Sequence, residues 1–158
     1  MKLIDILGGT PIPVAYRIAF ITNFWREPLL RRIETEYGLS RPEWTVLICL
    51  TYEDHLIARD ICEITEQPSN TVSRGVAELE RKGLITRQRD RDDGRQTRLS
   101  LTDAGRRMHD RAMSCMVEAE RCMLDTLSAD EVGQLTHLLD KLARDVTRWS
   151  KSPPYRTD

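Results

Sequence analysis

The sequence predicts a mainly helical (α+β) protein in which a winged helix-turn-helix at residues 40–102 lies between long helices at 10–39 and 103–150. Three observations lead to this prediction. Apolar residues recur at helical spacing on both sides of the middle region. The middle region contains two adjacent short helical patterns, and strand-like runs then flank Asp93-Gly94, a strong turn signal. All 158 residues fit one domain, and residues 151–158 are expected to form a frayed tail.

The first long helix is expected from Pro13 to Tyr37. Its inward face is predicted from the residues at helical spacing, which are Ile18, Thr22, Trp25, Leu29 and Ile33. Pro28 lies inside this pattern and has no N–H to donate, so we expect the helix to kink or restart there.

Three short helices should follow. Ser40 is a candidate N-cap for the first, whose apolar residues are Trp44, Leu47, Ile48 and Leu50. The second lies around residues 58–65, and its inward-facing residues should be Ile57, Ile61 and Ile64. The third begins near Ser69 and ends at Gly83, which can adopt the left-handed conformation that ends helices. Its buried residues are predicted to be Val72, Val76 and Leu79.

The opposite face of this third helix carries side chains that suit a DNA groove, namely Asn70, Ser73, Arg74, Ala77 and Arg81. In a helix-turn-helix, the second helix of the pair enters the major groove. Arg74 can donate two hydrogen bonds to a guanine edge, and Asn70 can pair with adenine. Ser69, Thr71 and Ser73 are short enough to contact phosphates without holding the helix away from the duplex.

Positive charge is concentrated next to this helix. Between Arg81 and Arg98 the chain has seven Lys or Arg against three Asp, a net charge of +4, although the whole chain carries only −1. Such a patch is typical of a nucleic-acid-binding face, and a solvated, charge-rich loop is the alternative. The hairpin should lie along the neighbouring DNA backbone, and its tip residue Arg95 can reach the minor groove. Arg81, at the end of the preceding helix, and Arg89 are further candidate DNA contacts. Turn aspartates such as Asp93 can pair with Arg95 and aim it outward, or can remain solvated.

Two further helices are expected after the hairpin. Thr102 caps the first, which runs to about Thr126 with a stripe of Met108, Ala112, Cys115, Ala119 and Cys122. Ser128 and Glu131 form a capping box at the start of the last helix. Its apolar residues form a narrow heptad seam: Val132, Leu135, Leu139, Leu142, Val146 and Trp149. Such a seam suits a partner helix, across a subunit interface or within the same chain.

The stretch NTVSRGVAELERKGLITRQRDRDDGRQTRLSLTDAGR resembles the winged helix-turn-helix of the multiple antibiotic resistance regulator (MarR) family. The matching pieces are Thr71 to Arg74, Leu79 to Leu84, the wing residues Asp90, Asp93 and Arg95, and Leu101 to Gly105. The resemblance implies a homodimer that binds a pseudo-palindromic operator in double-stranded DNA and usually represses transcription. It implies major-groove contacts by Asn70, Ser73 and Arg74, and a minor-groove contact by Arg95 that Asp93 orients. Gly94 departs from the family pattern, because many relatives carry a second arginine there.

The resemblance also implies release of DNA by a small aromatic, carboxylate-like effector. Its candidate lining is Tyr16, Arg17, Trp25, Trp44, Tyr52 and His55, although both tryptophans also fit packing positions. A thiol-based redox sensor is the alternative regulator. It would use one of four separate cysteines, for which burial is otherwise expected: Cys49, Cys62, Cys115 and Cys122.

Other classes of protein find no support in the sequence. No catalytic triad order, phosphate-binding glycine loop or metal-ligand spacing is present, so neither an enzyme nor a cofactor or metal site is expected. No uncharged run is long enough for a membrane span, and the protein is expected to be cytoplasmic. A winged helix used only for protein contact remains an alternative to DNA binding.

Overall fold

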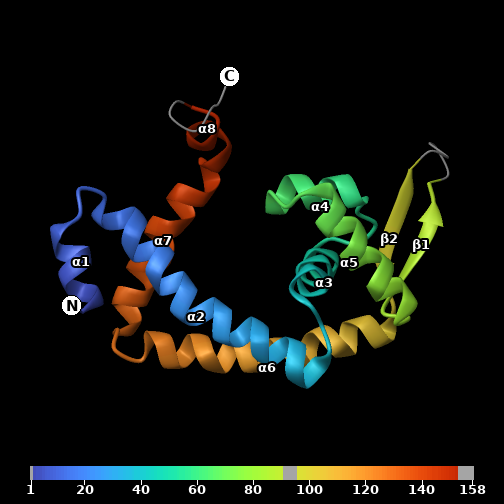
Figure 1. Ribbon diagram of the computed structural model, residues 1–158, viewed down its shortest axis with the longest axis horizontal. Coiled ribbons are helices and arrows are strands. Elements are labelled where there is room, and N and C mark those ends of the chain that lie inside the picture. The colour runs from blue at the N-terminus through green and yellow to red at the C-terminus, as the bar shows by residue number, and fades with distance from the viewer. Residues whose placement is uncertain (1, 91–95, 153–158) are drawn as a thin grey trace. The chain divides into compact units, whose positions relative to one another are not determined.

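The computed structural model describes residues 2–90 and 96–152. It is mainly helical with one two-stranded antiparallel sheet, which confirms the predicted fold class (Figure 1). The elements in chain order are α1 (Leu3–Gly9), α2 (Pro13–Tyr37), α3 (Arg41–Tyr52), α4 (Ala58–Thr65), α5 (Ser69–Arg81), β1 (Ile85–Arg89), β2 (Thr97–Leu101), α6 (Asp103–Leu124), α7 (Ala129–Arg144) and α8 (Val146–Ser150).

The chain forms two compact units that divide after Ala119, within α6. The first unit holds α3, α4 and α5 beside the β1–β2 hairpin (Figure 1). A cluster of buried apolar side chains forms its core, and the most enclosed of them include Ile33, Leu47, Leu50, Ile61 and Leu79. Among the described residues, no helix combines the length and the apolarity needed to cross a membrane.

Helix α2 continues through Pro28 instead of restarting there. It ends at Gly38, whose φ of 65° is left-handed and whose amide donates to the Glu34 carbonyl at 3.0 Å. Only the C-terminal half of the predicted inward face is buried: Leu29 and Ile33 are enclosed, whereas Ile18 is 44% exposed.

Helix α1 was not predicted. It has seven residues, and so short a helix is marginal by itself in water. Two contacts hold it. The Lys2 amide donates to the Asp5 carboxylate at 2.9 Å, and Arg17 Nη1 on α2 donates to the Leu7 carbonyl at 3.1 Å.

The helix-turn-helix pair, α4 and α5, packs with α3. Ile61 of α4 is fully buried, but Ile64 in its last turn is 59% exposed, so the prediction that Ile64 points inward was wrong. Helix α5 lies close to α3 at Gly75, where a Cβ atom would come within 2.9 Å of the Pro42 carbonyl. Glycine at this position therefore lets the two helix backbones approach each other.

Helix α5 ends as predicted. Gly83 has φ 68°, its amide donates to the Glu80 carbonyl, and the Leu84 amide donates to the Leu79 carbonyl, both at 2.9 Å. This pair of hydrogen bonds is the Schellman motif, and it turns the chain directly into β1.

The hairpin pairs Ile85 with Leu101 and Arg89 with Thr97. Leu99 is buried, and its amide donates to the Leu56 carbonyl at 2.8 Å, which fastens β2 to the α3–α4 loop. The predicted tip, with Asp93 and Arg95, lies outside the described residues.

Helix α6 is capped by Thr102, whose hydroxyl oxygen accepts from the Gly105 amide at 3.0 Å and donates to the Gly83 carbonyl at 2.8 Å. Its buried residues are Gly105, His109, Ala112, Cys115 and Met116. The predicted stripe was therefore only partly correct: Ala112 and Cys115 are buried, Met108 and Ala119 are half-buried, and Cys122 is exposed.

In the second unit, α7 begins with the predicted capping box. The Glu131 carboxylate accepts from the Ser128 amide at 2.8 Å, and the Ser128 hydroxyl accepts from the Glu131 amide at 3.3 Å. The predicted single helix is broken at Asp145, whose carboxylate binds Arg148 at 2.8 Å. The apolar seam is largely exposed: Leu135, Leu139, Leu142, Val146 and Trp149 keep between 37% and 46% of their surface.

Candidate nucleic-acid interface

The outer face of α5 presents polar groups that are free to bind a partner. Asn70, Ser73, Arg74 and Ala77 are exposed, as is Ser69 at the start of the helix. Within the described part of the chain, Ser69, Ser73 and Arg74 make no side-chain hydrogen bond or ion pair. This face therefore offers a guanidinium and two hydroxyls to an external ligand, on a helix whose other face is anchored in the core.

Five of the seven cations in the basic patch lie in the part of the chain that the structure describes, and four of these five are paired with acidic side chains. Two pairs are exposed: Arg81 binds Glu78 at 2.7 Å, and Arg87 binds Glu80 at 2.8 Å. Such surface pairs contribute little stability, so phosphate oxygens can replace these glutamates. In the other two pairs the carboxylate is buried: Lys82 with Glu43 and Arg98 with Asp90.

The net charge of +4 therefore overstates the positive charge that the patch has available for a ligand. It counts only residues 81–98, and three of the acidic partners lie outside that range: Glu43, Glu78 and Glu80. Arg89 is exposed, and the described residues provide it with no side-chain partner. The predicted contact residue Arg95 and its partner Asp93 lie outside the described residues, so their roles stay predictions.

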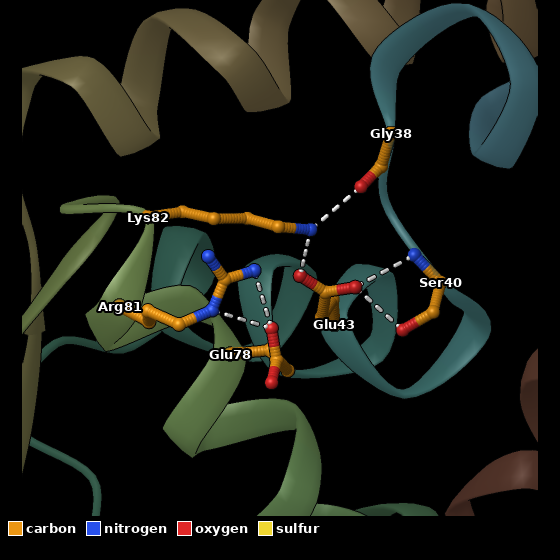
Figure 2. A network of polar contacts seen from close by, with 6 residues as sticks. All are labelled: Gly38, Ser40, Glu43, Glu78, Arg81 and Lys82. Atoms are coloured by element: carbon orange, nitrogen blue, oxygen red, sulfur yellow. Dashed lines mark hydrogen bonds and ion pairs between the residues drawn. The ribbon is translucent and has the colours of Figure 1, made fainter.

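Lys82 joins the end of α5 to the junction between α2 and α3 (Figure 2). Its ammonium donates to the Gly38 carbonyl at 2.6 Å and to the Glu43 carboxylate. The other carboxylate oxygen of Glu43 accepts from the Ser40 amide at 2.8 Å and from the Ser40 hydroxyl at 2.6 Å. The Glu43 side chain is only 4% exposed, so this is a buried anion with three donors.

Burial alone would raise the pKa of Glu43, but hydrogen bonds from Lys82 and Ser40 outweigh burial and lower it. Ionised Glu43 therefore contributes stability above its unfolded-state pKa. That contribution is lost as the pH falls through the lower pKa of the folded state.

A second polar cluster fixes the hairpin near the tip ends of its strands. Arg98 binds the buried Asp90 carboxylate, and its Nη1 donates to the His55 carbonyl at 3.1 Å. The His55 ring lies 2.9 Å from the Ser100 hydroxyl, and His55 itself has a φ of 64°, unusual for a residue with a side chain. Arg98 therefore holds the hairpin against the α3–α4 loop, and His55, a candidate ligand residue, lies beside β2 in this cluster.

The other candidate ligand residues have separate surroundings. Trp44 is 2% exposed and stacks on His109, with ring centroids 5.5 Å apart. Arg17 binds the Leu7 and Pro13 carbonyls, Tyr16 packs edge-on against Phe20, and Tyr52 is 79% exposed. No hydrogen bond or ring contact joins two of the six predicted lining residues to each other in the described ranges.

Two buried ring nitrogens lack hydrogen-bond partners among the described residues: Nε1 of Trp25, itself a candidate ligand residue, and Nε2 of His109, which stacks on Trp44. His109 was missed at the level of sequence. Its position between Gly105 and Ala112 on the buried stripe of α6 was the available signal.

The four cysteines are free thiols. Cys115 is buried and donates to the Ala112 carbonyl, Cys49 and Cys62 are half-buried, and Cys122 is exposed. Burial raises the pKa of the Cys49 thiol, which disfavours the reactive thiolate there. A thiol-based sensor stays a prediction.

The fold and the exposed face of α5 define a winged helix-turn-helix protein of the kind found in transcriptional regulators. A family model described as the MarR family matches residues 37–96. The HTH-type transcriptional regulator YdgJ of Bacillus subtilis is 32% identical over 113 residues, covering 72% of this chain and 67% of YdgJ. The chain belongs to the MarR family.

Other relatives agree with this assignment. The homoprotocatechuate degradative operon repressor of Escherichia coli is 28% identical over 115 residues, covering 70% of this chain and 75% of the repressor. A MarR-family regulator from Silicibacter pomeroyi has a crystal structure with a TM-score of 0.71 and 28% identity, covering 91% of this chain and 96% of that one. The S. aureus MepR–DNA complex shares the fold at 24% identity, with a TM-score of 0.70 over 87% of this chain and 99% of MepR. The relatives are regulators, as predicted, and not enzymes.

Proposed function

We propose that the protein is a transcriptional repressor that binds a pseudo-palindromic operator in double-stranded DNA as a homodimer. The observation that carries this proposal is the outer face of α5, where Asn70, Ser73 and Arg74 are exposed on a helix anchored by its opposite face. A helix held in this way can enter the major groove. The name of the Escherichia coli relative supports repression rather than activation.

Each proposed contact follows from side-chain chemistry. Arg74 and Asn70 read base edges in the major groove. The hydroxyls of Ser69, Thr71 and Ser73 bind phosphates at the start of α5, where the helix dipole also favours anions. The backbone and minor-groove contacts are Arg81 at the end of α5, Arg89 on β1, and Arg95, with Asp93 orienting Arg95.

Exposed apolar side chains in both units support the homodimer. In α1 and α2, Ile4, Val14, Ile21 and Phe24 keep between 50% and 71% of their surface, and the α7–α8 seam is also exposed. Apolar groups that recur along helices are typical of subunit interfaces. We assign dimerisation to residues 10–39 and 103–150, and DNA binding to residues 40–102.

Arg74→Ala is expected to weaken operator binding by about tenfold to a hundredfold and to relax base preference, because it removes a bidentate contact to a base. The measurement is selection of binding sites from random duplex DNA, followed by titration of the selected duplex. Lys151→Ala removes an exposed cation outside both assigned regions and serves as the control. If Arg74→Ala selected the same consensus sequence as the wild type, Arg74 would not contact bases.

A small aromatic carboxylate is proposed as the effector, with the six predicted lining residues as candidates. Trp25 Nε1 supports this proposal, because a buried N–H without an acceptor costs free energy that a ligand carboxylate would recover. Benzoate is expected to weaken binding to the selected duplex by about fivefold or more in the wild type, and not in Trp25→Phe. Equal release of DNA from both proteins would show that Trp25 does not bind the effector.

A further inference from the structure

Lys82 makes a connection between elements that its neighbour Arg81 does not make. Arg81 binds Glu78 within α5, with 68% of its side chain exposed. The Lys82 ammonium instead reaches residues 39 and 44 positions earlier in the chain, Glu43 on α3 and Gly38 at the end of α2 (Figure 2). One side chain thus connects the last turn of α5 to the junction of two other helices.

Capping of α3 does not require this connection. The capping box of α7 has the same chemistry, since the Glu131 carboxylate accepts from the Ser128 amide and hydroxyl at 2.8 and 2.9 Å. Glu131 is exposed, and no cation pairs with it in the described ranges. The burial of Glu43 and the presence of Lys82 are therefore additional features at the start of α3.

A buried carboxylate imposes a stricter geometry than apolar packing does. The contacts of Val72, Val76 and Leu79 hold α5 on the core, but apolar contact tolerates small rotations and shifts. An ionised carboxylate that is 4% exposed loses much free energy when its cation moves away. The ion pair consequently favours one placement of the C-terminal turn of α5.

We propose that Lys82 and Glu43 act as a positioning pair, which fixes α5 relative to the α2–α3 junction in the orientation that reads DNA. The proposal rests on the DNA-binding function proposed above. Lys82 then contributes to operator affinity through Glu43 and Gly38, and not as a phosphate contact. Glu43 contributes although it is an anion next to a DNA-binding helix.

Glu43→Gln separates positioning from simple electrostatics. The substitution keeps the shape of the side chain and removes a negative charge, so electrostatics alone would strengthen DNA binding. Positioning predicts the opposite, a loss of about tenfold in affinity for a duplex that the wild type selects from random DNA. Affinity for a scrambled duplex of equal composition should not fall, because non-specific binding depends on charge, which the substitution makes less negative, and not on the placement of α5.

Lys82→Met gives an independent test. It should weaken specific binding by about the same factor and leave the slope of log affinity against log salt unchanged, whereas loss of a phosphate contact would reduce that slope by about one. The double variant should bind like either single variant, because both disrupt the same pair. Lys82→Arg, which keeps the charge, should restore most of the affinity. Lys151→Met, which removes an exposed cation outside the regions assigned to DNA binding and dimerisation, is the control and should bind like the wild type.

Two outcomes would overturn the proposal: a Glu43→Gln protein that binds the selected duplex as tightly as the wild type or more tightly, or a salt slope that falls by about one in Lys82→Met. Failure of the DNA-binding function would be seen separately, as a wild type that selects no sequence. In that case hydrogen exchange of the backbone amides tests the positioning pair. Positioning predicts that the amides of residues 78–82 exchange at least about tenfold faster in either single variant than in the wild type. If Lys82→Met does not fold, Glu43→Gln, which retains an acceptor for Ser40, gives the same readouts.

Discussion

Gly105→Ala is expected to lower the free energy of unfolding by about 3 kcal/mol, at the upper end of the usual cost of overpacking. Gly105 lies in the first turn of α6, and a Cβ atom there would stand 2.0 Å from the Leu84 carbonyl oxygen. That oxygen also accepts from the Thr102 amide at 3.1 Å. Since the obstacle is backbone, the start of α6 and the start of the hairpin would have to separate.

The matched control is Gly133→Ala in α7. A Cβ atom at Gly133 would meet nothing within 4 Å, and alanine favours a helix over glycine by about 1 kcal/mol, so this variant should be at least as stable as the wild type. Chemical denaturation followed by circular dichroism measures both variants. A Gly105→Ala protein with the wild-type midpoint would show that the close approach to Leu84 is relieved at little cost.

Local signals in the sequence were sufficient to predict the elements that surround the α5 face. Gly83 ends α5 because its left-handed conformation is available to glycine at no steric cost, and Thr102 and Ser128 cap helices through neighbouring amides. These interactions span five residues or fewer. Helical spacing likewise identified the buried side of α5, because a helix as short as this one has a single contact face.

Interactions between distant residues could not be predicted in this way. Spacing places Ile64 on the face of Ile61 but does not show where the covering helices stop. The pairing of Lys82 with Glu43 depends on the packing of α5 against α3, and no pattern within either helix indicates it. The same holds for Arg98 and the His55 carbonyl, which lie 43 positions apart. A count of charges along the sequence therefore included Lys82 and Arg98 as cations that could bind DNA, although the fold pairs both with buried carboxylates.

Leu139→Glu is expected to convert the proposed homodimer into monomers and to weaken operator binding by at least about a hundredfold. Leu139 lies in the middle of the α7 seam and is 43% exposed, with Leu135 and Leu142 one turn away on either side. In a homodimer the substitution places two carboxylates in an apolar interface, where burying a charge is costly. A monomer holds one half-site at a time, so it loses the gain in effective concentration that links the two α5 helices.

The control is His137→Glu, which introduces the same side chain on the opposite side of α7, in favourable spacing with Lys141. It should stay dimeric and keep wild-type affinity in sedimentation and DNA titration. Both substitutions introduce a glutamate into α7, on different faces of the helix, and neither replaces a proposed DNA contact. If Leu139→Glu remained dimeric, the α7 seam would not be the interface. If it became monomeric yet bound the selected duplex as before, one α5 helix would suffice for recognition, and the twofold operator would no longer follow from the fold.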